Sequence, residues 1–121
     1  MKQSCGIDVV EVKRMEHSLK NPRFLTRCFT PEELAYFETR ATAPRTVAAH
    51  FAAKEAFGKL FGTGLAGFSL LEVSVSHTQA GAPYFTLTGE AAKMAEGWEL
   101  SLSLTHDAGI AAAVAVGIKP D

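Results

Sequence analysis

A carboxylate and an ammonium group stand four residues apart in the most distinctive stretch of the sequence. Glu55 and Lys59 lie in FAAKEAFGK, residues 51–59, so on a helix they share one face. Two interpretations are open. The pair forms a surface salt bridge, which is common and contributes only about 0.3–0.5 kcal/mol, or the carboxylate binds a metal ion and the ammonium group binds a phosphate oxygen.

A second carboxylate lies in an apolar stretch near the N-terminus. Asp8 is flanked by Ile7 and Val9, where an ionised side chain is costly to bury without a cation or hydrogen-bond donors. Asp8 either caps the helix that follows or binds a metal ion. Together with Glu55 it would supply the hard oxygen ligands that Mg²⁺ prefers.

The other candidates for chemistry are weaker alone. His106 ends the run SLTH at residues 103–106, where it either reaches a ligand over the edge of a sheet or is an ordinary turn histidine. The run GTG at residues 62–64 is explained by a helix stop and is not a Walker loop. No GxSxG nucleophile elbow occurs, and Asp107 adjoins His106, so the sequence predicts no Ser-His-Asp triad.

Helices in the first half and strands in the second must position these residues. Thr30, Pro31 and Glu33 form a strong helix start with a capping box. Helices are expected over about residues 11–20, 23–28, 31–39, 44–60 and 89–96. Strands are expected over about residues 5–10 (buried), 71–75, 84–88, 100–105 and 110–116. The fold class is therefore α+β, with N-terminal helices packed on a mostly antiparallel sheet.

Length and composition exclude several classes of protein. The 121 residues are 47% hydrophobic, which fits one domain over residues 1–121. The net charge of −1 gives no reason to expect nucleic acid or an anionic membrane as a partner. Cys5 and Cys28 have neither CxxC spacing nor a surrounding His or Cys cluster, so we expect reduced thiols. No long apolar segment is present, which predicts a cytoplasmic protein.

Positive charge is concentrated in one short segment. Five basic residues fall between positions 13 and 27, where Glu16 is the only acidic residue: Lys13, Arg14, Lys20, Arg23 and Arg27. This is either a solvated helix face or a surface that attracts an acidic partner protein.

Taken together, the motifs resemble those of the small bacterial phosphopantetheinyl transferases. GID at residues 6–8, FAAKEA at 51–56 with Lys59, GTG at 62–64, GAP at 81–83 and SLTH at 103–106 match that family in order and spacing over nearly the whole chain. The combination of FAAKEA with an upstream Gly-x-Asp and a downstream Ser-x-Thr-His is highly specific.

The resemblance implies an enzyme that transfers 4′-phosphopantetheine from coenzyme A to a serine of apo acyl carrier protein in fatty-acid biosynthesis, releasing 3′,5′-ADP. It implies Asp8 and Glu55 as Mg²⁺ ligands and Glu55 and Lys59 as catalytic residues. The implied coenzyme A contacts are Lys59, Gly62, Thr63, Gly64, Pro83, Thr105, His106 and the position of His50. The implied carrier-protein contacts are Arg14, Arg23, Phe24 and Arg27. It also implies a homotrimer with active sites between subunits.

Three positions depart from the family pattern. His50 stands where the family usually has Arg, Leu70 where Asp is frequent, and Ala82 where Lys is common. The changes at His50 and Ala82 each affect one expected phosphate contact. Two alternatives to the transferase stay open: a non-catalytic module that binds coenzyme A or an acidic protein, and an acyl-CoA-using transferase or thioesterase that needs no metal.

Overall fold

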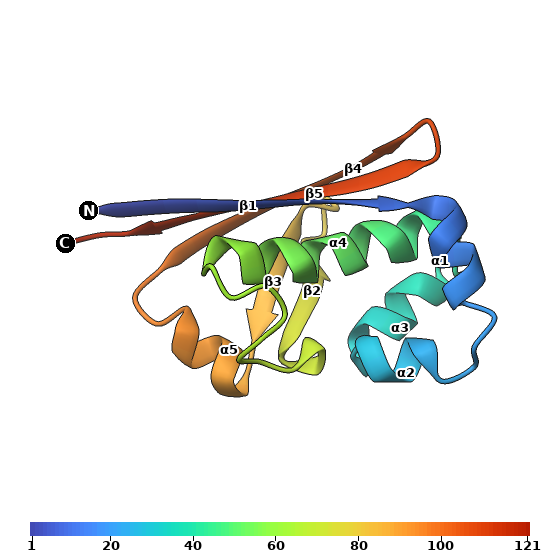
Figure 1. The fold of residues 1–121 in the computed structure, drawn as a ribbon, viewed down its shortest axis with the longest axis horizontal. Coiled ribbons are helices and arrows are strands. Elements are labelled where there is room, and N and C mark those ends of the chain that lie inside the picture. The colour runs from blue at the N-terminus through green and yellow to red at the C-terminus, as the bar shows by residue number, and fades with distance from the viewer.

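A three-stranded antiparallel sheet and one long helix form the frame of the molecule. A computed structural model describes all residues, 1–121. The sheet has the order β1-β5-β4, with β1 at Lys2–Glu11, β5 at Ile110–Lys119 and β4 at Glu99–Asp107. The helix α4, Pro44–Leu60, runs along one face of this sheet (Figure 1).

The smaller elements gather at the two ends of α4. Helices α1 (Val12–Ser18), α2 (Phe24–Cys28) and α3 (Pro31–Glu38) lie at its N-terminal end (Figure 1). A 3₁₀ turn (Leu70–Glu72), the antiparallel hairpin of β2 (Val73–His77) and β3 (Pro83–Leu87), and α5 (Gly89–Met94) cover the rest of the helix. The expected α+β fold is confirmed, and every strand pair is antiparallel, but the strands form two sheets. No helix has both the length and the apolar character needed to cross a bilayer.

Local signals set the ends of the two helices that matter most for the site. At the start of α3, the Thr30 hydroxyl accepts a bond from the Glu33 amide, and Glu33 accepts one from the Thr30 amide at 3.0 Å, as the capping box predicts. At the end of α4, Gly62 and Gly64 adopt φ angles of 75° and 60°. The amides of Thr63 and Gly64 donate to the Gly58 carbonyl, so the predicted helix stop is confirmed.

Two expectations for the strands were wrong. We expected residues 5–10 to be buried, yet Ile7 and Val9 are 61% and 56% exposed, because α4 covers only one face of the sheet. We expected Leu71 to begin a strand, but it lies in the 3₁₀ turn. Ser69 and Glu72 cap that turn reciprocally, and the strand begins only at Val73.

Small side chains let α4 lie close against the sheet. Its Ala52, Ala53 and Ala56 are fully buried in a core cluster with Ala113 and Ala115 of β5. Where β1 crosses the helix, a Cβ atom on Gly6 would lie only 2.0 Å from the Ala56 carbonyl oxygen. Glycine is therefore required at this crossing, which holds Asp8, two residues further on, beside α4.

A buried ion pair fixes α4 against α3 and the hairpin. Lys54 Nζ donates to Glu33 Oε1 at 2.7 Å, and both side chains are fully buried. The same ammonium group donates to the carbonyls of Leu70 and Val73, while Glu33 Oε2 accepts from the Val75 amide. The Lys within FAAKEA is thus fully occupied inside the protein, and Glu55 is the charged residue of this motif that lines a cleft.

Candidate active site

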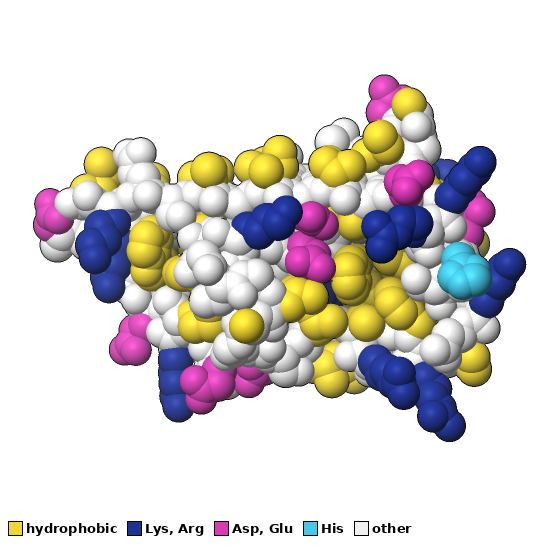
Figure 2. Space-filling view, viewed as in Figure 1, with side chains coloured by type: hydrophobic (Ala, Val, Ile, Leu, Met, Phe, Trp, Pro, Cys, Tyr) yellow, Lys and Arg dark blue, Asp and Glu magenta, His cyan; other side chains and the backbone are white.

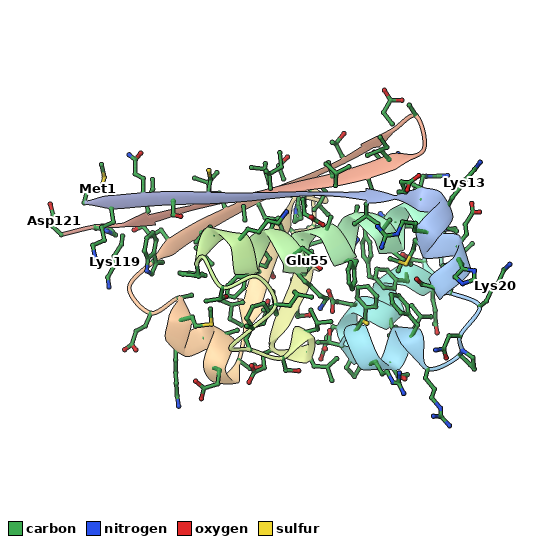
Figure 3. All side chains as sticks on the ribbon, viewed as in Figure 1. Met1, Lys13, Lys20, Glu55, Lys119 and Asp121 are labelled. Carbon is green, nitrogen blue, oxygen red and sulfur yellow. The ribbon has the colours of Figure 1, made fainter.

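The first cleft lies where β1, α1, α2 and α4 meet, and we call it the carboxylate cleft. It has a volume of about 250 Å³ and is lined by Asp8, Val9, Val10, Arg14, Met15, Ser18, Phe24, Phe51 and Glu55. Glu55 projects from the middle of α4, on the side where β1 passes over the helix (Figure 3). The fold therefore brings both predicted metal ligands into one cleft.

Lys59 forms an ion pair with Asp8. Its Nζ lies 3.1 Å from Asp8 Oδ1, whereas Glu55 and Lys59 form no ion pair with each other. The simple i,i+4 salt bridge is thus not formed. Nor does Asp8 cap a helix, because Glu11 occupies the N-cap of α1 and makes no side-chain cap bond. The geometry instead joins Asp8, Glu55 and Lys59 across two elements.

The charges in this cleft suit a bound cation. Burial raises the pKa of Glu55, and the Asp8 carboxylate raises it further, while the Lys59 ammonium lowers it. Two carboxylates that repel each other offer hard oxygen ligands in a partly open cleft. No group of three or more His, Cys, Asp or Glu gathers to hold a metal ion. Mg²⁺ is typically held through one or two carboxylates, with water and phosphate oxygens completing its shell, and Asp8 and Glu55 would supply those two carboxylates.

A second cleft lies between α3, α4, the β2–β3 hairpin and β4, and we call it the histidine cleft. It has a volume of about 240 Å³ and is lined by Tyr36, Arg40, Thr46, Ala49, His50, His77, Gly81, Pro83, Leu104, Thr105 and His106. It thus brings together four of the residues predicted to contact coenzyme A: His50, Pro83, Thr105 and His106.

His50 is a buried, neutral side chain in this cleft. It is 3% exposed, and its Nδ1 lies 2.7 Å from the Thr46 carbonyl oxygen. Because a carbonyl only accepts, Nδ1 carries the proton, and Nε2 faces His77 Nε2 at 3.3 Å. Burial lowers the pKa of His50 to about 4. Near pH 7 residue 50 therefore carries no positive charge.

The two clefts lie on opposite edges of the three-stranded sheet. Asp8 of β1 pairs with Ala113 of β5, which pairs in turn with Leu104 of β4. Two strand spacings of about 4.8 Å separate these edges by about 10 Å. The clefts share no lining residue, and the loop at residues 62–64 lines neither. Within one chain, the predicted site residues therefore form two separate groups.

The predicted carrier-protein residues lie beside the carboxylate cleft. Arg14 and Phe24 line the cleft itself, and Arg23 and Arg27 are exposed on and just before α2. Lys and Arg side chains gather over this end of the molecule (Figure 2), where Lys13 and Lys20 point outward (Figure 3). The positive charge therefore lies next to the two carboxylates.

Three members of the histidine cleft that the sequence did not reveal form a stack: Tyr36, Arg40 and His77. The Tyr36 and His77 rings stack in parallel with centroids 3.8 Å apart, and the Arg40 guanidinium lies 4.2 Å above the Tyr36 ring centroid. These residues come from α3, the residues after it and the end of β2. No local pattern in the sequence links them.

Comparison with known proteins defines the class. The chain matches the family model of the 4′-phosphopantetheinyl transferase superfamily over residues 4–115. It belongs to this superfamily, and is thus an enzyme of the phosphopantetheinyl transferase class.

Within the superfamily, the chain is similar to holo-[acyl-carrier-protein] synthases. That of Treponema denticola is 45% identical over 115 residues, which are 92% of this chain and 94% of the relative. That of Moorella thermoacetica is 41% identical over 116 residues, covering 93% and 91%. The crystal structure of the Neisseria meningitidis synthase superposes with a TM-score of 0.87 at 33% identity, covering 96% of this chain and 98% of that one. The Helicobacter pylori synthase in complex with coenzyme A gives a TM-score of 0.85 at 33% identity, covering 94% and 99%.

Proposed function

We propose that this phosphopantetheinyl transferase acts as a holo-[acyl-carrier-protein] synthase at the carboxylate cleft. It moves 4′-phosphopantetheine from coenzyme A to a serine of apo acyl carrier protein, in fatty-acid biosynthesis in the cytoplasm. The observation that supports the assignment best is the meeting of Asp8, Glu55 and Lys59 at one edge of the sheet. A non-catalytic binding module would have no need for two repelling carboxylates beside an ammonium group.

The reaction exchanges one P–O bond for another. The serine oxygen bonds to the β-phosphorus of coenzyme A, the bond from that phosphorus to the bridging oxygen breaks, and 3′,5′-ADP leaves with the electron pair. Asp8 and Glu55 would hold Mg²⁺, which when bound neutralises and orients the pyrophosphate. Lys59 contributes the remaining positive charge, and its half-exposed ammonium group stabilises negative charge that grows on the leaving side.

Glu55 is the proposed general base. Without a metal ion, burial and the neighbouring Asp8 raise the pKa of Glu55, and a bound Mg²⁺ would favour its ionised form, the form that accepts a proton. It takes the serine proton directly or through one water molecule. Arg14 and Phe24, which line the same cleft, would then contact the carrier protein beside its serine, and Arg23 and Arg27 would extend that contact over α2.

Coenzyme A has its nucleotide end in the histidine cleft, against Pro83, Thr105 and His106. Gly62, Thr63 and Gly64, which the resemblance assigns to coenzyme A, follow the helix that carries Lys59, and their backbone amides donate to the carbonyls of Lys59 and Gly58. This arrangement requires both clefts, and in one chain they occupy opposite edges of the sheet.

A homotrimer would bring the carboxylate cleft and the histidine cleft of different copies together. The face of the sheet that α4 does not cover presents Ile7 and Val9 of β1 and Ile110 and Val116 of β5, all exposed. Hydrophobic side chains line the upper margin of the molecule, where this sheet lies (Figure 2). Apolar surface of this kind is suited to contact with further copies. The carboxylate cleft of one copy would then meet the histidine cleft of the next.

The function is tested by incubating the protein with apo carrier protein, coenzyme A and Mg²⁺ and recording the intact mass of the carrier. The carrier should gain one phosphopantetheine group, and should gain none with EDTA or when its acceptor serine is replaced by alanine. An unchanged mass would favour a binding module.

Interfacial sites are tested by mixing Asp8→Ala with His106→Ala chains, each of low activity. After exchange of subunits about a quarter of the interfaces combine two intact clefts and regain activity; a mixture no more active than its components would contradict the shared site.

A further inference from the structure

The positively charged group of the histidine cleft comes from Arg40, a residue outside the motifs of the sequence. Residue 50, where the family usually has Arg, is a buried neutral imidazole. Arg40 follows α3 and lines the same cleft as His50, Thr105 and His106. The cleft therefore has a permanently charged side chain, but this side chain comes from the residues after α3 and not from residue 50 on α4.

A stack of side chains holds Arg40 over the cleft. The Arg40 guanidinium lies 4.2 Å above the Tyr36 ring centroid, and one of its nitrogens donates to Thr39 Oγ1 at 2.8 Å. The His77 ring also stacks on the Tyr36 ring, with ring centroids 3.8 Å apart and an interplanar angle of 4°. His77 Nε2 in turn faces His50 Nε2. The buried His50 thus anchors the stack that carries the arginine, whereas the arginine itself is exposed.

The backbone after Arg40 supports the same placement. Ala41 and Thr42 adopt φ angles of 54° and 47°, a conformation that side-chain-bearing residues rarely adopt in succession. The amides of Arg40 and Thr42 both donate to the Phe37 carbonyl, so this tight turn is bonded to the end of α3. Strained backbone of this kind persists where the surrounding structure over-determines it.

Arg40 is also free of acidic partners. It forms no ion pair, and no Asp or Glu lines the histidine cleft. An unpaired guanidinium beside the hydroxyl of Thr105 and the imidazoles of His77 and His106 has the donors that an anion requires. A guanidinium binds a phosphate through two parallel N–H donors, a geometry that lysine cannot reproduce.

We propose that Arg40, held by Tyr36 and His77, binds the 3′-phosphate on the ribose of coenzyme A and makes the enzyme selective for coenzyme A over 3′-dephospho-coenzyme A. This inference rests on the proposed function, which assigns the pyrophosphate to Asp8, Glu55 and Lys59. The phosphate left for the nucleotide end is then the 3′-monoester, the group by which the two cofactor forms differ.

The test compares transfer from coenzyme A and from 3′-dephospho-coenzyme A by the wild type, Arg40→Ala and Arg40→Lys, with Lys93→Ala as a control that removes a remote exposed cation. We expect wild-type kcat/KM to favour coenzyme A by about 10- to 100-fold, in line with charge-assisted hydrogen bonds. Arg40→Ala should lower kcat/KM for coenzyme A by that factor and leave kcat/KM for 3′-dephospho-coenzyme A unchanged. The two substrates should then have nearly equal kcat/KM. Arg40→Lys should fall between, and Lys93→Ala should match the wild type.

A binding measurement separates this inference from the proposed reaction. By titration calorimetry, Arg40→Ala should bind 3′,5′-ADP about 10- to 100-fold more weakly than the wild type, with little change for 5′-AMP. Equal losses for both nucleotides, or none, would overturn the role of Arg40 even if transfer proceeds normally. If the wild type fails to modify the carrier protein while this nucleotide selectivity holds, the proposed function fails and the anion site stands.

Discussion

Lys59 Nζ lies 3.1 Å from Asp8 Oδ1, and this ion pair joins the C-terminal half of α4 to β1 beside the Glu55 carboxylate. Glu55 and Lys59 are four residues apart on one helix, yet the lysine pairs with the strand. The pairing leaves Glu55 without a direct ionic partner in a cleft that also contains Asp8.

The protonation of Glu55 should therefore respond in opposite directions to the loss of its two charged neighbours. Asp8→Asn should lower the pKa of Glu55, because the Asp8 carboxylate adds to the effect of burial in raising it. Lys59→Met should raise the pKa further, because the ammonium group opposes these effects. Carbon-detected NMR titration of the Glu55 carboxyl measures both shifts. Two variants with an unaltered Glu55 titration would show that the three side chains do not lie close together in solution.

The crossing of β1 over α4 should tolerate no side chain at residue 6. Gly6→Ala places a Cβ 2.0 Å from the Ala56 carbonyl oxygen, so the strand must shift. We expect a loss of unfolding free energy of about 1–3 kcal/mol, as for other overpacked sites, and lower transferase activity because Asp8 moves with the strand. Urea denaturation and the transfer assay check this, with Gln3→Ala at an exposed site of the same strand as the control. A Gly6→Ala protein as stable and active as Gln3→Ala would mean that the crossing is looser than the structure shows.

Acid should destabilise the protein through His50. The pKa of the buried imidazole is lowered from its ordinary 6.5 to about 4, chiefly by burial. Above pH 6.5 both folded and unfolded chains hold it neutral. As the pH falls from 6.5 toward 4 the unfolded chain takes up a proton that the folded chain does not, so stability is lost. At 1.36 kcal/mol per pKa unit the loss reaches about 3 kcal/mol.

His50→Asn should lack this part of the acid sensitivity, since its amide can still donate to the Thr46 carbonyl and does not titrate. Urea denaturation of both proteins between pH 7 and pH 4 measures the difference. Parallel loss of stability in both proteins would show that His50 is not the responsible group.

Carrier-protein recognition should depend on the basic residues near α2. Arg27→Glu, alone or combined with Arg14→Glu, should raise the KM for the acidic carrier protein on the order of tenfold and reduce its salt dependence. The KM for coenzyme A should stay nearly unchanged in the single variant, because Arg27 lines neither cleft. Lys119→Glu, at the opposite end of the molecule (Figure 3), is the matched control. An unaltered carrier KM, or an equal rise for coenzyme A, would exclude this docking surface.

Features with local signals could be predicted from the sequence. The start of α3 follows from Thr30, Pro31 and Glu33, and the end of α4 from Gly62 and Gly64. Leu71 was misplaced because its alternation with polar neighbours continues that of the true strand, and only the reciprocal Ser69–Glu72 bonds reveal the 3₁₀ turn.

Features that depend on distant elements could not be predicted. The exposure of Ile7 and Val9 reflects which face of the sheet α4 covers, and an apolar strand sequence is compatible with burial on one face or two. The Glu33–Lys54 pair joins residues that are 21 positions apart. The stack of Arg40, Tyr36 and His77 likewise arises only when α3 meets the end of β2. Asp8, Glu55 and Lys59 could be grouped because their motifs resemble those of one family.

The most direct test of the account is a single-turnover transfer of phosphopantetheine to apo carrier protein, followed by intact-protein mass spectrometry at saturating Mg²⁺. Glu55→Gln keeps the shape of the side chain but removes its charge and its basicity, whereas Glu90→Gln makes the same change at an exposed site on α5. With matching circular dichroism spectra, Glu55→Gln should transfer the group at least about 100-fold more slowly than the wild type, and Glu90→Gln should equal the wild type. A Glu55→Gln enzyme that modifies the carrier at the wild-type rate would contradict the assignment of the reaction to the carboxylate cleft.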